Sequence, residues 1–205
     1  MISFCRRMVP LLSVFAVLSG AALRPVNAAV FDPETFTLGN GMQVVVVQNH
    51  RVPVVTHMVW YRVGAADEGP GETGVAHFLE HLMFKGTPSH PDGEFSTIVA
   101  RNGGQENAFT AYDYTGYYQT VARDRLELVM AMEADRMTNL VLSDEDINTE
   151  RLVVLEERRS RTDNNPSAVL SEQANAALFL NYPYRRPIIG WEHEILGLNR
   201  KAILD

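Results

Sequence analysis

The sequence predicts an α+β fold in which a mixed, largely antiparallel sheet has helices packed on one face. β-Branched and apolar residues alternate through residues 35–63 and again through residues 105–121, a pattern typical of half-buried strands. From residue 123 onward helical patterns dominate. Strands followed by helices without strict βαβ alternation indicate an α+β layer structure.

The strands are expected in two groups. We expect them at about residues 35–38, 42–48, 53–63, 105–112 and 114–121. Asn40-Gly41 separates the first two strands, and this dipeptide favours a tight type I′ hairpin turn. Asp113 marks the turn between the last two strands.

The helices are bounded by capping signals. We expect them at about residues 73–86, 91–101, 123–139, 143–161 and 166–180. Thr73 is the expected N-cap of the first helix, and Gly86 is its expected stop. The run from Ser143 to Asp146 resembles a capping box, with acidic residues at the positive end of the helix dipole.

Composition excludes several classes of protein. The 205 residues are 46% hydrophobic and 21% charged, which excludes a disordered polar chain and a multi-span membrane protein. The formal net charge is −7 and no run is rich in lysine and arginine. Nucleic acid is therefore not expected as a partner, because phosphate neutralisation needs a basic surface.

The N-terminus has the features of a cleaved secretory signal. Arg6 and Arg7 precede an apolar stretch, residues 8–23, and Val26-Asn27-Ala28 offers a small-residue cleavage pattern. The apolar stretch is shorter than a membrane span needs. We expect residues 1–28 to be removed, leaving residues 29–205 as an exported domain with no membrane span. Cleavage removes three arginines and the single cysteine, which lowers the net charge to about −10 and leaves no disulfide.

The strongest chemical signal is His77-Phe78-Leu79-Glu80-His81 on the first predicted helix. Two imidazoles at i and i+4 lie on one face of a helix, at a spacing that lets both bind one metal ion. Glu80 lies beside them. The alternative is a pair of surface histidines next to a helical carboxylate.

A catalytic zinc site needs a third protein ligand, and the helix expected at 143–161 offers candidates. Glu150 and Glu157 lie two turns apart, on a face that also presents Val153 and Val154. That face is either buried around a cation or solvated, and periodicity alone does not decide between the two. Glu156 points about 100° away from Glu157, so it is disfavoured as the partner of Glu150.

With this motif and its neighbouring residues, the chain resembles the pitrilysin/insulinase family of zinc peptidases, which carry the inverted motif H-x-x-E-H. It is most similar to the N-terminal catalytic domain of the bacterial exported members. The resemblance spans nearly all of residues 29–205. It rests on runs at 38–42, 74–87, 107–110 and 150–157. Together these runs are highly specific.

The resemblance implies a role for each residue of the motif. His77 and His81 correspond to zinc ligands, Glu157 to the third ligand, and one Zn²⁺ is expected per chain. Glu80 corresponds to the general base that activates water. Glu150 takes the place of the family's outer-shell glutamate, which orients a ligating histidine.

The resemblance also implies a peptide substrate. Residues 105–110 match the family's edge strand, which takes substrate as an extra strand, with Asn107, Ala108 and Phe109 nearest the scissile bond. The alternative is an ordinary core hairpin. The expected activity is zinc-dependent endoproteolysis of peptides or unfolded segments, in the bacterial periplasm.

The chain is less than half as long as usual family members, which have two related halves. We therefore expect the C-terminal part of the domain and the second half to be absent from residues 29–205. A second half-domain or a homologous partner subunit is the expected partner. The alternative function is a non-catalytic or truncated subunit that binds zinc but needs the missing half or a partner for activity.

Overall fold

The computed structural model describes residues 32–204. The predicted signal peptide, residues 1–28, lies outside the described residues. The chain divides into two compact units, the first ending at Arg51 and the second beginning at Val52. No helix within residues 32–204 is long and apolar enough to cross a membrane.

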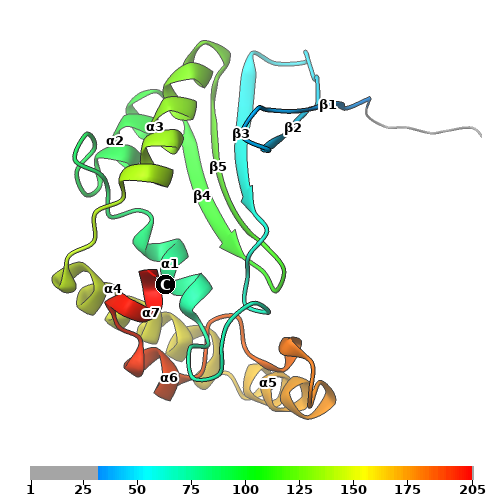
Figure 1. The fold of residues 1–205 in the computed structure, drawn as a ribbon, viewed down its shortest axis with the longest axis vertical. Coiled ribbons are helices and arrows are strands. Elements are labelled where there is room, and N and C mark those ends of the chain that lie inside the picture. Colours follow the sequence, from blue (N-terminus) through cyan, green and yellow to red (C-terminus); the bar gives the residue numbers. More distant parts are fainter. Residues whose placement is uncertain (1–31, 205) are drawn as a thin grey trace, which may run out of the picture. The chain divides into compact units, whose positions relative to one another are not determined.

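In the first unit, strand β1 (Glu34–Thr37) pairs antiparallel with β2 (Gln43–Val46) (Figure 1). The hairpin closes through Leu38 N–H to Met42 O and Gly41 N–H to Leu38 O, each 2.9 Å. Gly41 has a φ of 88°, but Asn40 does not have a positive φ. The expected type I′ turn is therefore wrong, because that turn needs a positive φ at both central residues.

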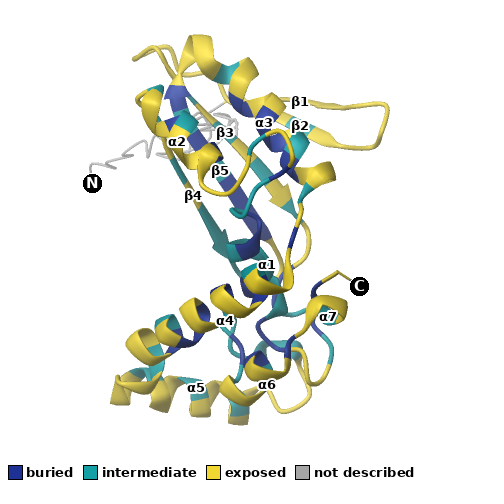
Figure 2. Cartoon of the chain, turned by 90° about the vertical axis from the view of Figure 1, so that its left-hand side faces the viewer, coloured by how far each residue is buried: buried dark blue, intermediate teal, exposed yellow. Residues whose placement is uncertain are grey.

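The second unit contains a three-stranded antiparallel sheet. Its strands are β3 (Val54–Tyr61), β4 (Gln105–Thr110) and β5 (Thr115–Ala122), in the order β3-β5-β4. Central strand β5 is the most buried of the three (Figure 2). β4 lies at the edge of this sheet. The predicted α+β fold is confirmed, and every strand pairing within residues 32–204 is antiparallel.

Helices α2 (Glu94–Arg101) and α3 (Leu126–Asn139) cover one face of the sheet, as expected (Figure 1). Alternation along β3 exposes Thr56 and turns Val55 inward, opposite Val121 of β5. A short 3₁₀ turn, residues 123–125, leads into α3. The core of this layer consists of Phe95, Val99, Val121, Val129 and Met132.

A second apolar core joins the remaining helices. Helix α1 (Val75–Leu82) packs against α4 (Asp144–Arg158), α6 (Glu192–Gly197) and α7 (Arg200–Leu204), around a buried group that includes Phe78, Leu82, Val154 and Ile195. α1 also contacts β4 and β5, so it lies between the sheet and the helical layer. A π-helical turn, Arg159–Asp163, links α4 to α5 (Pro166–Leu178). α6 was not predicted.

The ends of the helices test the capping predictions. α4 begins at Ser143 with a reciprocal capping box to Asp146, as predicted. Thr73 as the N-cap of α1 is wrong: Gly74 is the N-cap and provides no side chain. The Thr73 hydroxyl instead accepts a hydrogen bond from Trp191 N–H at 3.0 Å, so it joins the start of α1 to the segment before α6.

Two glycines, Gly74 and Gly190, allow the start of α1 and the segment before α6 to approach closely. Gly74 and Gly190 both have a φ of 88°. A Cβ at Gly190 would collide with Thr73 O, and one at Gly74 would lie 2.6 Å from Ile189 O. Both contacts are with backbone atoms, which cannot rotate away.

We expect Gly190→Ala to lower the free energy of unfolding by about 3 kcal/mol, because a left-handed backbone strain is added to a backbone clash. Gly71→Ala is the matched control, since Gly71 has a φ of 87° and a Cβ at this position would meet nothing within 4 Å. The control should lose about 1 kcal/mol. Urea unfolding of both variants gives the comparison, and equal losses would contradict the proposed close approach.

Candidate metal centre

A cavity of about 850 Å³ lies where α1, β4 and the end of α4 approach one another. Residues from α5 and from the segment 185–189 complete its wall. His77, Glu80, His81, Asn107, Ala108, Phe109, Glu150 and Glu157 all line it. The structure therefore brings every predicted site residue to one cavity.

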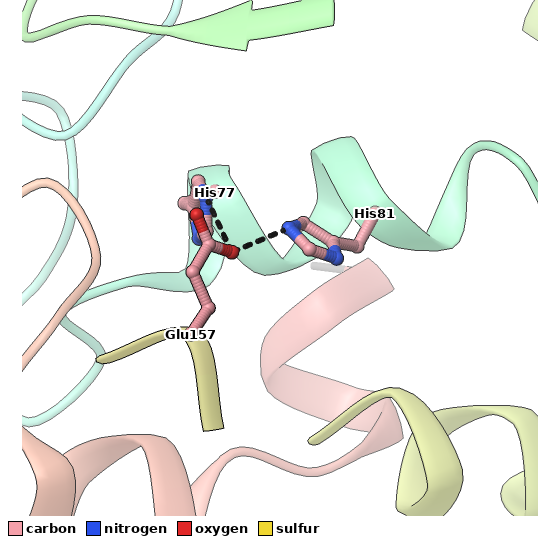
Figure 3. A group of neighbouring side chains, drawn as sticks. All are labelled: His77, His81 and Glu157. Carbon is pink, nitrogen blue, oxygen red and sulfur yellow. Dashed lines mark ion pairs between the residues drawn. The ribbon is translucent and has the colours of Figure 1, made fainter. Parts of the chain in front are cut away.

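His77, His81 and Glu157 form a group of potential metal ligands in the cavity (Figure 3). One turn of α1 separates the two histidines, and their ring centroids are 4.7 Å apart. Glu157 Oε2, from α4, lies 3.7 Å from His77 Nε2 and 3.2 Å from His81 Nε2. The three ligand atoms lie within 4.8 Å of one another.

This group fits a zinc ion. Two ligands bound about 2.1 Å from a tetrahedral ion are roughly 3.4 Å apart, and both distances to Glu157 are close to that value. Two imidazoles and one carboxylate are also a known donor set for catalytic zinc, which leaves one position for water. The residues present therefore match the metal that the sequence predicts.

Glu157, rather than Glu156, faces the histidines. The Glu156 side chain is 71% exposed and pairs with Arg159 at 3.4 Å. The sequence left open whether the face with Glu150 and Glu157 is buried or solvated. Val154 is fully buried and Glu150 is 9% exposed, whereas Val153 is 46% exposed, so this face of α4 is buried along a narrow stripe.

Glu150 holds the far side of the His81 ring. Its Oε1 lies 2.9 Å from His81 Nδ1, and its Oε2 accepts from Lys85 Nζ at 2.8 Å. Because Nδ1 is engaged, Nε2 is the nitrogen that His81 presents to Glu157. The hydrogen bond to His81 lowers the pKa of Glu150 to about 2, despite an opposing effect of burial.

Arg161 holds the second oxygen of Glu157, with Nη1 to Oε1 at 2.6 Å. It comes from the π-helical turn, one turn after Glu157. Neither Arg161 nor Lys85 was predicted to take part in the metal centre. The i+4 spacing from Glu157 to Arg161 was an available signal, but such pairs are common on exposed helices.

Glu80 lines the cavity and is held from the sheet. Its Oε2 accepts a hydrogen bond from the Thr110 hydroxyl at the end of β4. Burial raises the pKa of Glu80, and the Thr110 hydrogen bond opposes that effect. Thr110 was inside a recognised sequence run but had no predicted role, because only the fold shows that it reaches α1.

The pKa values of the two histidines are shifted in opposite directions. Burial, followed by the neighbouring His81, lowers the pKa of His77 below its usual range. Burial alone would also lower the pKa of His81. The hydrogen bonds to Glu150 and Glu157 outweigh it and raise the pKa of His81 to about 9.

Asn107, Ala108 and Phe109 lie on the edge strand, beside the metal-binding group. Asn107 Oδ1 accepts from Ala108 N–H at 2.8 Å. The Phe109 ring packs over Gly116 and lies 5.2 Å from the Trp60 ring. All three residues line the cavity from the edge strand. Their contact with a substrate remains a prediction.

The chain is similar to known proteins in sequence and in fold. Residues 43–192 match the model of the insulinase family, peptidase family M16. The chain is 37% identical over 201 residues to the zinc protease PqqE of Helicobacter pylori, covering 97% of this chain and 45% of that protein. It is also 38% identical over 176 residues to an uncharacterized zinc protease of Mycobacterium bovis, covering 86% and 40%.

Solved structures agree with the sequence matches. The crystal structure of a protease from Helicobacter pylori superposes with a TM-score of 0.81 at 38% identity, covering 84% of this chain and 42% of that one. The chain thus spans less than half the length of the curated relatives that it matches. The extent of these matches shows that the chain belongs to the insulinase family of peptidases, family M16.

Proposed function

We propose that the chain carries the catalytic centre of a zinc metalloendopeptidase, with one Zn²⁺ held by His77, His81 and Glu157. The observation that carries this proposal is the convergence of three ligand atoms in one cavity with the partly buried carboxylate of Glu80. The relatives' names as zinc proteases support the same metal and the same class of reaction.

The proposed reaction is hydrolysis by an activated water. Zinc supplies polarisation of water and of the peptide carbonyl, and it lowers the pKa of water towards 7. Glu80 accepts the proton from the attacking water and then donates it to the leaving amine. No covalent intermediate with the chain is required.

The surrounding residues keep Glu80 and the ligands in position. Thr110 holds one oxygen of Glu80, so the carboxylate is oriented before substrate binds. Glu150 fixes the His81 ring, and Arg161 fixes the second oxygen of Glu157. Holding ligands through such outer contacts maintains metal affinity and geometry.

An extended peptide is the proposed substrate. The β4 edge offers backbone groups for an added strand, and Asn107, Ala108 and Phe109 lie along the cavity. Peptides and unfolded segments are the expected substrates, because their backbone is free to pair with a strand edge.

Export to the bacterial periplasm is part of the proposal. The signal-like pattern of residues 1–28 supports it. One structural neighbour is the periplasmic protease PqqL from Escherichia coli, with a TM-score of 0.76 at 25% identity, covering 83% of this chain and 20% of that one.

A non-catalytic or truncated subunit is the second candidate. The share of the relatives that the chain covers, 45% of the Helicobacter pylori protein, favours it. In that case a second half-domain or a homologous partner would supply the remaining substrate contacts. Cleavage of a flexible fluorogenic peptide by the 205-residue chain, above a Glu80→Gln blank, would support the first candidate. Cleavage that begins only when a second half-domain or a homologous partner is added would support the second.

We expect Glu80→Gln to lower peptide hydrolysis by about 10²- to 10⁴-fold while zinc stays bound. The amide keeps the shape of the carboxylate but cannot accept the proton. Turnover is measured with whichever form is active, the chain alone or the chain with its partner, and zinc by metal analysis. Glu156→Gln is the control and should leave both values unchanged. Near-normal turnover in Glu80→Gln would rule out the assigned base.

We also expect zinc affinity to increase as the pH rises from about 6 to about 9. His81 must lose its proton to bind zinc, and its pKa is raised to about 9, so zinc competes with a proton across this range. His77 is already neutral there because its pKa is lowered. Competition titrations at several pH values provide the test, and a flat profile would contradict the assigned role of His81.

A further inference from the structure

We propose that Glu68 is a positioning residue of the metal centre, which fixes α1 by binding its N-terminal backbone from outside the helix. This inference rests on the proposed function, because α1 carries His77, Glu80 and His81. Glu68 has no predicted role and does not line the cavity. It acts through the helix rather than through contact with metal or substrate.

Both oxygens of Glu68 are used. Oε2 accepts from Gly74 N–H and Oε1 accepts from Ala76 N–H, each at 3.0 Å. Free N–H groups at a helix start are normally capped by the residue at that position, but Gly74 provides no side chain. Glu68 therefore supplies the missing cap from six residues upstream.

The cap lies directly beside the first of the proposed zinc ligands. Ala76 directly precedes His77, and α1 has only eight residues, or about two turns. A helix this short is not stable by itself in water. Its rotation and axial position depend on contacts at its ends, so a two-point contact beside His77 constrains both imidazoles.

Glu68 is itself fixed to the rest of the site. Arg186, in the cavity wall, donates through Nη1 to the Glu68 carbonyl. Just upstream, Ala65 N–H and Ala66 N–H donate to Ala111 O and Tyr112 O, at 3.0 and 2.8 Å. The Glu68 segment thus links the start of the ligand helix to the end of β4, the strand proposed to hold the peptide.

The environment of Glu68 is costly for a carboxylate. The residue is 7% exposed, and burial raises its pKa to about 7, although its two backbone hydrogen bonds and Arg186 oppose that rise. An exposed cap would hold the helix without this cost. A buried bidentate carboxylate is better explained by the need for a single helix position.

The test compares zinc binding in wild type, Glu68→Gln and Glu68→Asp. Gln presents one acceptor and an amide that cannot accept the second N–H, and Asp is one methylene too short to span both. We expect the zinc dissociation constant, measured by competition with a chromophoric chelator, to rise about tenfold in each variant, which is a typical effect of losing one helix cap. Co²⁺ absorption spectra should change in shape.

Asp146→Ala is the matched control, because it removes the side-chain acceptor of the Ser143 N–H from the capping box of α4, at the end remote from Glu157. It should lower stability towards urea comparably but change zinc affinity less than twofold. Unchanged zinc affinity in a folded Glu68 variant would overturn the inference. So would equal losses in the Asp146 control, since they would reflect stability alone. Glu68→Asp keeps the charge and decides the matter if Glu68→Gln does not fold. Wild type without zinc binding would instead refute the proposed function.

Discussion

The meeting of α1 and α4 is the contact on which the rest of the site depends. His77 and His81 come from one helix and Glu157 from another, so the three ligand atoms meet only if both helices hold a fixed distance and rotation. Phe78, Leu82 and Val154 pack between the helices and set that distance. The apolar core thus determines the geometry of a polar centre, which neither helix could form alone.

Charge balance is the second constraint. Glu80, Glu150 and Glu157 all face one cavity, and bringing three carboxylates together would be unfavourable without nearby positive charge. Lys85 neutralises Glu150, and Arg161 neutralises Glu157. The same two carboxylates, Glu150 and Glu157, raise the pKa of His81. Their negative charge would also stabilise a divalent cation bound among these groups.

The sequence predicted the features that follow local rules. Helical spacing paired His77 with His81, and the resemblance to known peptidases distinguished Glu157 from Glu156, a choice that helical phase also favoured. Features formed across the fold were missed. Thr110 reaches Glu80 from another element, and Glu68 replaces Thr73 as the cap of α1 because Thr73 bonds to Trp191 instead. Caps and turns depend on partners that local patterns do not reveal.

The position of β4 at the edge of its sheet also favours pairing between copies of the chain. A strand edge that accepts a peptide cannot distinguish it, through backbone hydrogen bonds alone, from a strand of another copy of the same chain. β4 has one inward-turned charge, Glu106, whose Oε2 is buried. The next three residues, Asn107, Ala108 and Phe109, offer neither a charge nor a proline to block such pairing. Solubility at high concentration and access for the proposed peptide substrate are therefore opposing demands on the same six residues.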